Sequence, residues 1–273
     1  MRCDRCQTFI PKKMNQCPSC GYWQFRGEAA SDDDALIPLS EVDESALETR
    51  YQTGRWDRVW GGSVEPGISR IGVYFIGGYP GSGKSTLSLQ TLAPIVEVEE
   101  RPALYLGNEQ GGAEIKKMAR RIGMKRFDLV YVPKIRGGIT YPLSNSILSC
   151  NPCCIIQDSL PGNEGASLVE SASILSGLKD IADTECPVIV VNHVNSEGEM
   201  AGWMQLEHLV TGVYMLEPTH RRDDPWRRFR AMKNRMGRTE SMILEMGDKG
   251  LFAHPDACPC HVCKKEALHA GKR

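Results

Sequence analysis

An α/β fold with a mainly parallel sheet is the fold class that this sequence predicts, because short apolar runs alternate with stretches of helical periodicity. Such alternation is typical of sheets whose two faces are both covered by helices. A second observation, two CxxC pairs near the N-terminus, predicts a small separate module ahead of this core. The expected strands of the core are residues 71–76, 102–109, 128–133, 153–159 and 186–194, and the expected helices are 112–123, 167–184 and one from Thr86.

Composition indicates an ordinary soluble protein. The 273 residues are 25% charged and 41% hydrophobic, with a formal net charge of −1. A nucleic-acid surface would therefore have to be local, since the whole chain provides no basic field. The longest apolar run, PVIVV, is far shorter than the ~20 residues that span a bilayer, and the sequence begins MRCDRC, without a signal-like segment. We expect a cytoplasmic protein without a membrane partner.

The cysteine pairs at the N-terminus have the spacing of a metal-binding module. Each CxxC turn can direct two thiolates at one ion, and four thiolates select Zn²⁺ in a closed structural site. So short a segment cannot bury enough surface to fold without the metal, although scattered free thiols are the alternative. We expect a zinc ribbon over residues 1–26 and an acidic linker over 27–48, and the expected zinc ligands are Cys3, Cys6, Cys17 and Cys20.

A glycine-rich loop with the pattern GxxxxGK[ST] follows the first expected strand and precedes a helix. In that position the backbone N–H groups can surround phosphates, Lys84 can reach the β- and γ-phosphates, and Ser85 can hold Mg²⁺. The alternative, a chance match in a glycine-rich turn, does not explain the strand and helix on either side. The residues expected to bind ATP here are Gly78, Gly81, Ser82, Gly83, Lys84, Ser85 and Thr86.

Polar residues end the other expected strands, at the edge of the sheet where ligands bind in this fold class. Asp158 could hold Mg²⁺ through water or cap a helix, and Glu109 could orient the attacking water or be a loop carboxylate without a catalytic role. Asn192 and His193 could sense the γ-phosphate, although a loop histidine without this role is nearly as good an interpretation. The sequence therefore predicts an NTPase site at this edge.

The order of these motifs resembles the bacterial RadA/Sms family. CxxC…CxxC is followed by TG…DRVWGG…EPG, GGYPGSGKST, GNEQ, QDS, NHVNSEGEMAGWMQLEH and KNRMG, and the resemblance covers about residues 1–252. It implies a RecA-like ATPase core over residues 49–252 that forms hexameric rings like those of DnaB-type helicases. It also implies binding of single-stranded DNA in the ring channel and movement driven by ATP hydrolysis.

The family's functional positions transfer residue by residue. The four cysteines named above match its zinc ligands, and Lys84 and Ser85 match its nucleotide loop. Glu109 falls at the position of its catalytic glutamate, and Asp158 at that of its Walker B aspartate. The KNRFG signature of the family corresponds to Lys233, Asn234, Arg235, Met236 and Gly237, with Met236 in place of phenylalanine.

Two further features depart from the family. Gln157 stands where an apolar residue usually precedes the Walker B aspartate. The resemblance ends near Phe252, so we expect the family's C-terminal protease-like domain to be absent and residues 253–273 to form a flexible tail. That tail could instead hold a second metal through Cys258, Cys260, His261 and Cys263, but their spacing is irregular.

The KNRMG segment has two interpretations. Strand alternation in RFRAMKNR places Lys233 and Arg235 on one face, two residues apart, where both could meet a polyphosphate bound to a neighbouring subunit. A charged, solvated strand edge is the usual meaning of such a run. The resemblance favours catalysis in trans for these two residues.

Contacts to DNA are less clear from sequence. The loops after Asp158 and His193 would face the channel, yet neither is rich in Lys or Arg. Trp203 could stack on a base or pack against a neighbouring subunit. Cys150, Cys153 and Cys154 are expected to be core thiols.

The functional prediction is an ATP-dependent, single-stranded-DNA-binding motor, a homo-oligomer that uses ATP, Mg²⁺ and Zn²⁺ in recombination, repair or replication and meets proteins of those processes. One alternative is a nucleotide-switched DNA-binding or loading factor, or recombinase mediator, in which hydrolysis matters little. A primase-helicase fragment would need a polymerase domain for which the linker is too short, and a P-loop kinase would need a lid that we do not find.

Overall fold

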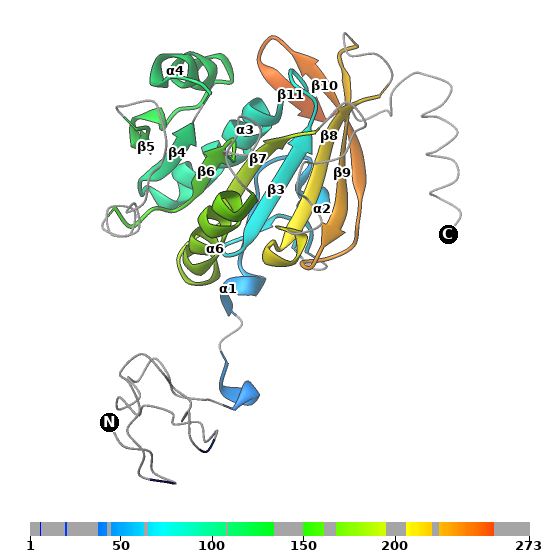
Figure 1. The fold of residues 1–273 in the computed structure, drawn as a ribbon. Helices are drawn as coiled ribbons and strands as arrows, with labels where there is room; N and C mark the ends of the chain where they lie inside the picture. The colour runs from blue at the N-terminus through cyan, green and yellow to red at the C-terminus, as the bar shows by residue number, and fades with distance from the viewer. Residues whose placement is uncertain are drawn as a thin grey trace, which may run out of the picture. The chain divides into compact units, whose positions relative to one another are not determined.

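A nine-stranded mixed sheet forms the centre of the unit Glu44–Arg273, and the computed structural model shows it in Figure 1. The remaining unit, Met1–Asp43, contains the short 3-10 helix η2 (Leu39–Glu41). The structure describes residues 6, 20, 38–42, 45–62, 65–107, 109–133, 150–160, 168–194, 206–219 and 224–253. Cys3, Cys17, Trp203 and the tail from His254 onward lie outside these residues, so the predictions made for them stay predictions. The four-part domain division also stays a prediction.

Six strands of the sheet are parallel, as the sequence predicts, and three antiparallel strands extend one edge. A separate antiparallel pair is formed by β1 (Arg50–Tyr51) and β2 (Ile68–Ser69). In spatial order the main sheet consists of β11 (Gly250–Ala253), β10 (Ser241–Gly247), β9 (Trp226–Asn234), β8 (Gly212–Pro218), β3 (Val73–Gly78), β7 (Val188–His193), β6 (Ile155–Asp158), β4 (Ala103–Gly107) and β5 (Val130–Tyr131).

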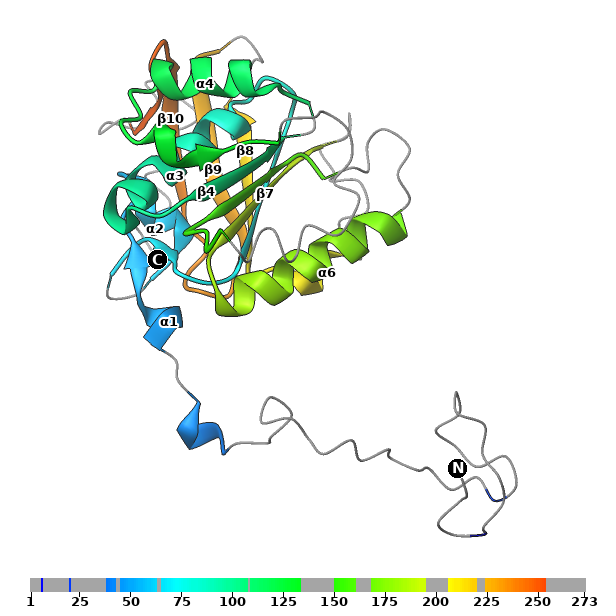
Figure 2. The same ribbon diagram turned by 90° about the vertical axis from the view of Figure 1, so that its left-hand side faces the viewer.

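Helices cover the two faces of the sheet, and Figure 2 shows α6 lying along one of them. The alternation along β3 explains this arrangement, since Val73 and Phe75 pack with the α6 residues while Tyr74 and Ile76 pack with those of α3. The described helices are α1 (Ser45–Glu48), α2 (Asp57–Trp60), α3 (Lys84–Glu99), α4 (Gly112–Arg121) and α6 (Leu168–Thr184), with η3 (Phe127–Leu129) and η4 (Glu207–Leu209) as 3-10 turns. Among the described residues, every helix is too short or too polar to cross a membrane.

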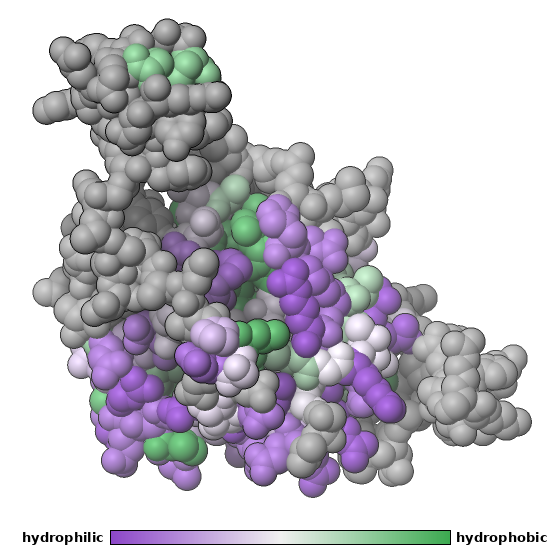
Figure 3. All heavy atoms as spheres, turned by 90° about the horizontal axis from the view of Figure 1, so that it is seen from below, coloured by the Kyte–Doolittle hydropathy of each residue, from purple (hydrophilic) through white to green (hydrophobic). Residues whose placement is uncertain are grey.

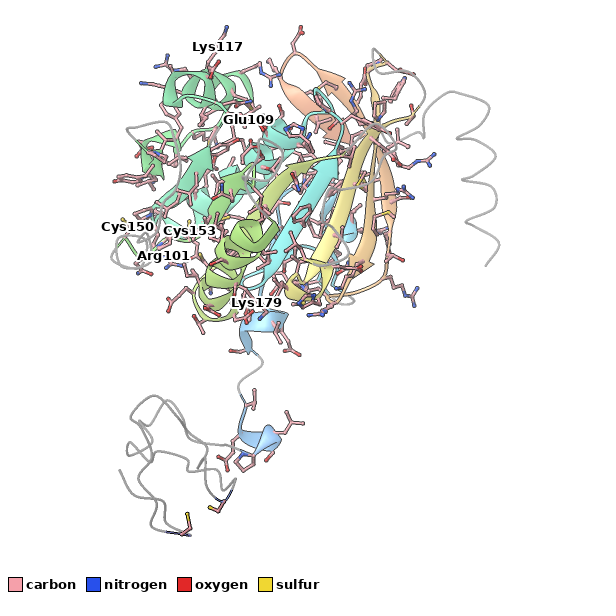
Figure 4. All side chains as sticks on the ribbon, viewed as in Figure 1. Arg101, Glu109, Lys117, Cys150, Cys153 and Lys179 are labelled. Carbon is pink, nitrogen blue, oxygen red and sulfur yellow. The ribbon has the colours of Figure 1, made fainter. Side chains whose placement is uncertain are left out.

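Because β3, β4, β6 and β7 run parallel, their carboxyl ends meet at one edge of the sheet. Glu109 lies at this edge, just beyond β4, whereas Arg101 lies at the opposite end of the same strand (Figure 4). This edge therefore gathers the residues that end the predicted strands, in keeping with the position of ligand sites in open α/β sheets.

Candidate nucleotide-binding site

The loop between β3 and α3 has the backbone of a phosphate-binding turn. Gly81 and Gly83 have φ values of 76° and 103°, which favour glycine, and Gly83 is the N-cap of α3. A Cβ on Gly83 would lie 2.2 Å from the Cε of Met246 on β10, so a larger residue there would displace the end of that methionine side chain. The free N–H groups of the first turn of α3 lie next to this loop, and they favour an anion.

A cavity of about 410 Å³ opens beside this loop. It brings together predicted residues from four elements, because the start of α3 and the ends of β4, β6 and β7 converge on it. Gly78 ends β3 and Ser82 is buried in the loop, so neither lines the cavity, and the same holds for Asn192. The residues that line the cavity are Pro80, Gly81, Gly83, Lys84, Ser85, Thr86, Glu109, Gln110, Met118, Arg121, Asp158, His193 and Met246.

Lys84 is held within the loop by carbonyl oxygens. Its Nζ donates to the carbonyls of Gly78 at 2.8 Å and Tyr79 at 3.0 Å, and it lies 3.2 Å from Nδ1 of His193. Burial lowers the pKa of Lys84 to about 8, although the charges of Asp158 and Glu109 oppose the shift. Phosphate oxygens would be stronger partners for this ammonium group than neutral carbonyls, because they are charged.

The two residues predicted to hold Mg²⁺ are connected by a tyrosine that sequence reasoning missed. The Tyr105 phenol donates to Asp158 Oδ2 and is also hydrogen-bonded to the Ser85 side chain. Desolvation and the charge of Asp158 raise the pKa of Tyr105 well above its usual value, so the phenol remains a donor. Ser85 and Asp158 thus present hard oxygen atoms at one point of the cavity, a donor set that fits Mg²⁺.

Glu109 lies across the cavity and keeps a side chain that is 46% exposed. It accepts a hydrogen bond from Ser159 Oγ at 2.8 Å, and its Oε1 lies 3.0 Å from Nε2 of His193. Since His193 Nδ1 faces the Lys84 ammonium, the proton of a neutral imidazole belongs on Nε2, which then donates to Glu109. His193 therefore connects the predicted phosphate-binding lysine with the predicted catalytic glutamate. Asn192 Oδ1 accepts from the His193 backbone N–H at 2.9 Å, so Asn192 contacts the residue that lines the cavity.

Part of the cavity wall beside the phosphate loop consists of side chains that were not predicted from sequence. Met118 and Arg121 come from α4 and Met246 comes from β10. Arg121 is fixed by two hydrogen bonds, to Thr86 Oγ1 and to the carbonyl of Asp248, both at 3.1 Å. Two thioethers and a guanidinium group suit a flat aromatic ligand such as a nucleobase. The sequence predicts Thr86 only as part of the phosphate loop, whereas in the structure its hydroxyl oxygen also accepts the hydrogen bond from Arg121.

Comparison with known proteins identifies the relatives. The chain is 31% identical to the DNA repair protein RadA of Bacillus subtilis strain 168, 30% to that of Pseudomonas aeruginosa and 27% to that of Aquifex aeolicus strain VF5. These matches cover 91%, 91% and 96% of this chain and 58%, 58% and 61% of the relatives. Over nearly its whole length, the chain is homologous to these RadA proteins. It spans less than two thirds of the length of these curated RadA proteins.

The fold likeness extends beyond RadA. A KaiC-like protein from the hyperthermophilic archaeon Pyrococcus horikoshii OT3 superposes with a TM-score of 0.62 at 16% identity, over 76% of this chain and 99% of that protein. At this level of identity the match bears on the fold alone, and it supports a RecA-like core. No family model matches the sequence.

The RadA signature KNRMG lies at the other end of the sheet from the cavity. Gly212 pairs with both Tyr74 and Asn234, so Asn234 is level with the start of β3. At about 3.3 Å per residue, the four residues from Tyr74 to Gly78 place Asn234 roughly 13 Å from the nucleotide loop along the strand direction. Lys233, Asn234 and Arg235 accordingly do not line the cavity of their own chain.

Lys233 and Arg235 point to the same short segment. Lys233 Nζ donates to the carbonyl of Glu207, and Arg235 Nη2 donates to the carbonyl of His208 at 3.2 Å. Burial and the nearby charge of Arg235 lower the pKa of Lys233. The predicted proximity of these two side chains is therefore present in the structure, although Arg235 lies just beyond β9. Their catalytic role stays a prediction.

Asn234 forms hydrogen bonds with the backbone around the KNRMG segment. Its Nδ2 donates to the carbonyls of Trp60 at 3.2 Å and Arg238 at 3.1 Å, and its Oδ1 accepts from the backbone N–H of Met236. The Met236 carbonyl in turn accepts from the Gly62 N–H at 2.9 Å. KNRMG thus packs on the WGG segment, although the two segments lie far apart in the sequence.

The buried and N-terminal cysteines complete the predicted residues. Cys153 and Cys154 are fully buried, as predicted, but the prediction of a core thiol is wrong for Cys150, which is exposed and is labelled in Figure 4. Burial raises the pKa of Cys153 to about 11, which makes it an unreactive thiol. Cys6 and Cys20 are the two described members of the predicted zinc set, and the described residues contain no group of three or more metal-ligating side chains. The zinc ribbon therefore stays a prediction.

Proposed function

We propose that this chain is an ATPase that binds single-stranded DNA and acts as a motor in DNA repair or recombination. One observation carries the proposal: the phosphate loop, the linked pair Ser85 and Asp158, and Glu109 all face one cavity. The RadA relatives are named DNA repair proteins, which supports the process but not the motor activity. The names of the relatives do not mention helicase activity or single-stranded DNA, so these parts of the proposal depend on the RadA resemblance.

Each side chain has a defined task in ATP hydrolysis. Lys84 and the first turn of α3 bind the phosphates, and Ser85 and Asp158 hold Mg²⁺. The metal supplies neutralising charge for the β- and γ-phosphates. Glu109 orients and activates the attacking water, because it is exposed toward the cavity and already fixed by Ser159 and His193. His193 connects the occupancy of the phosphate site with the position of Glu109.

Among the described residues that line the cavity, only Arg121 carries a guanidinium group that could stabilise the transferred phosphoryl group. Arg121 is held at Thr86, beside the phosphate loop rather than across from it. A neighbouring subunit's Arg235, assisted by its Lys233, is therefore proposed to complete the site in trans. This proposal implies a homo-oligomer with repeating interfaces, and a hexameric ring is the closed form that the RadA resemblance favours.

The zinc ribbon is part of the same proposal. The donor spacing of Cys3, Cys6, Cys17 and Cys20 is that of a tetrahedral structural site. We expect one Zn²⁺ per chain in the purified protein, lost in Cys6→Ser. Metal analysis that finds no zinc in the reduced wild-type chain would reject the zinc ribbon and leave the proposed ATPase activity unaffected.

The decisive experiment measures ATP hydrolysis with and without single-stranded DNA, together with the mass of the protein bound to a non-hydrolysable ATP analogue. We expect DNA to raise the rate and the analogue to favour an oligomer. Glu109→Gln should bind ATP like wild type and hydrolyse it about 10³-fold more slowly, since it retains the shape but not the base. A monomer whose hydrolysis ignores DNA would contradict the motor. A Glu109→Gln variant that retains its biological function would instead support a nucleotide-switched loading factor.

A further inference from the structure

Arg227 is a buried arginine that contacts the nucleotide loop from behind. It begins the alternation of β9, on the same face as the buried Phe229, and only 6% of its surface is exposed. Its Nε lies 3.2 Å from the carbonyl oxygen of Ser82, and its Nη1 donates to the carbonyls of Asp224 and Trp226. The structure thus places it against the loop GSGK.

The contact with Ser82 determines the direction of a neighbouring amide. The Ser82 carbonyl and the Gly83 N–H belong to one planar trans peptide group, so they point in opposite directions. Arg227 holds the carbonyl on the inner side of the loop. The Gly83 N–H is thereby directed to the outer side, where Gly83 lines the cavity next to Lys84. The left-handed φ of 103° at Gly83 is part of the same turn.

A charged side chain suits this task better than a neutral one. Burial lowers the pKa of Arg227 while Asp224 opposes the shift, and even so a guanidinium group stays charged at neutral pH. A cation on the carbonyl polarises the peptide group and makes its N–H a stronger donor. It also adds positive charge behind a site that would bind polyphosphate, with little screening by solvent.

We propose that Arg227 is a positioning residue that orients and polarises the Ser82–Gly83 peptide group, so that the Gly83 N–H donates to a phosphate group of the bound nucleotide. The inference rests on the proposed nucleotide site and adds to it a residue on β9, far in sequence from the loop itself. It predicts a selective loss of affinity for ligands with phosphates in the loop, and no loss for the nucleoside part.

The test compares Arg227→Met and Arg227→Lys with wild type in the full-length chain. We expect Arg227→Met to weaken ADP binding about tenfold, which corresponds to one lost hydrogen bond to a charged group, and to leave adenosine binding unchanged. Arg227→Lys should recover part of the loss, since it keeps the charge without the planar fork. Arg230→Met is the matched control, because Arg230 lies on the other face of the same strand and pairs with Glu217 at 3.0 Å.

A second measurement distinguishes a specific effect on the Gly83 N–H from a general loss of packing around the nucleotide loop. In protein labelled with ¹⁵N-glycine, the Gly83 amide signal of wild type should move strongly when ADP is added, and this shift should be reduced in Arg227→Met. Wild-type affinity together with a wild-type Gly83 shift in that variant would overturn the inference. Equal losses for ADP and adenosine would overturn it as well. If Arg227→Met fails to fold, the same criteria apply to Arg227→Lys. Failure of wild type itself to bind ADP would instead reject the proposed nucleotide site.

Discussion

Tyr105 shows how much of a site can depend on one hydroxyl group that sequence patterns do not reveal. A tyrosine in the run PALYLG is ordinary for a buried strand, and the residues it connects lie 20 positions before and 53 positions after it. Sequence reasoning identified Lys84, Ser85, Glu109, Asp158 and His193, because each follows a strand or fits a loop pattern, and the structure brings these five to one cavity. It could not identify Tyr105 or Arg227, because their roles come from contacts across the sheet.

Replacing Tyr105 with phenylalanine should weaken the metal site. The substitution leaves the buried Asp158 carboxylate without its phenol donor, so its orientation toward Ser85 is lost. We expect the Mg²⁺ concentration for half-maximal ATP hydrolysis to rise about tenfold, with recovery of the rate at high Mg²⁺. Tyr131→Phe, on the neighbouring strand with a half-exposed side chain, is the control. An unchanged Mg²⁺ dependence in Tyr105→Phe would show that the phenol does not support the metal ligands.

Lys84 gives the nucleotide site a dependence on pH. Its pKa is lowered to about 8, so between this value and 10.5 the unfolded chain carries a proton that the folded chain lacks. Stability therefore rises with pH across that window. Bound phosphate favours the charged form, so ADP binding at pH 8 should take up about half a proton. Calorimetric titrations in buffers of different ionisation enthalpy measure this uptake, and Lys84→Arg should abolish it. Proton release, or no exchange, would contradict the assignment.

At the scale of elements, the sequence predicts the parallel strands but neither the edge hairpin nor the order of the strands in the sheet. Runs such as VIVV lie between helices and are buried on both faces, so composition alone predicts β7. The edge hairpin of β10 and β11 alternates weakly, with only Leu244 buried in β10, so its pattern does not distinguish it from a loop. The position of β3 between β7 and β8 depends on pairing across more than a hundred residues, which no local pattern encodes.

Gln157 departs from the family pattern, and its position in β6 explains its role. Its side chain is buried within β6, where an apolar residue was expected, and its Nε2 donates to the carbonyl of Ser159 at 2.9 Å. Ser159 in turn donates to Glu109. Gln157 therefore stabilises the turn that positions the proposed catalytic glutamate, and it does not weaken the assignment of Asp158.

Helix α3 is joined to the β1–β2 pair through Glu99. Burial raises the pKa of Glu99, but hydrogen bonds from Tyr51 and Arg101 and the charges of Arg70 and Arg101 outweigh it, so its pKa is lowered. Its stabilising effect is therefore present above pH 4.5, the ordinary pKa, and is lost as the pH falls through the lowered value.

Glu99→Gln should reduce the free energy of unfolding at pH 7, because Arg70 and Arg101 lose the negative charge of their partner. The loss should be about 1–2 kcal/mol, since both arginines are partly exposed and solvent screens their charges. Denaturant unfolding at pH 7 and at low pH measures the difference from wild type, which should shrink as Glu99 becomes protonated. Glu97→Gln, in the same helix with a weaker exposed pair to Lys125, should have no measurable effect. Equal effects of the two substitutions would contradict the role given to Glu99.

At the scale of the whole molecule, the two functional groups of residues occupy opposite ends of the sheet. Strand β9 runs between them, with Arg227 at the nucleotide loop and Lys233 near the other end. The view from below in Figure 3 shows a mostly hydrophilic surface among the described atoms, with scattered hydrophobic residues. Arg235 does not line the cavity of its own chain, so the catalytic role proposed for it requires a second copy arranged head to tail.

The most direct test of the central claim mixes two inactive variants, Glu109→Gln and Arg235→Ala, and measures ATP hydrolysis with single-stranded DNA present. At an interface where the Arg235→Ala chain supplies Glu109 and the Glu109→Gln chain supplies Arg235, the site is complete. Random mixing in equal amounts should restore about a quarter of the wild-type rate, because half of the sites carry Glu109 and half of those meet an intact Arg235. A mixture that assembles but remains as inactive as its components would contradict catalysis across a subunit interface.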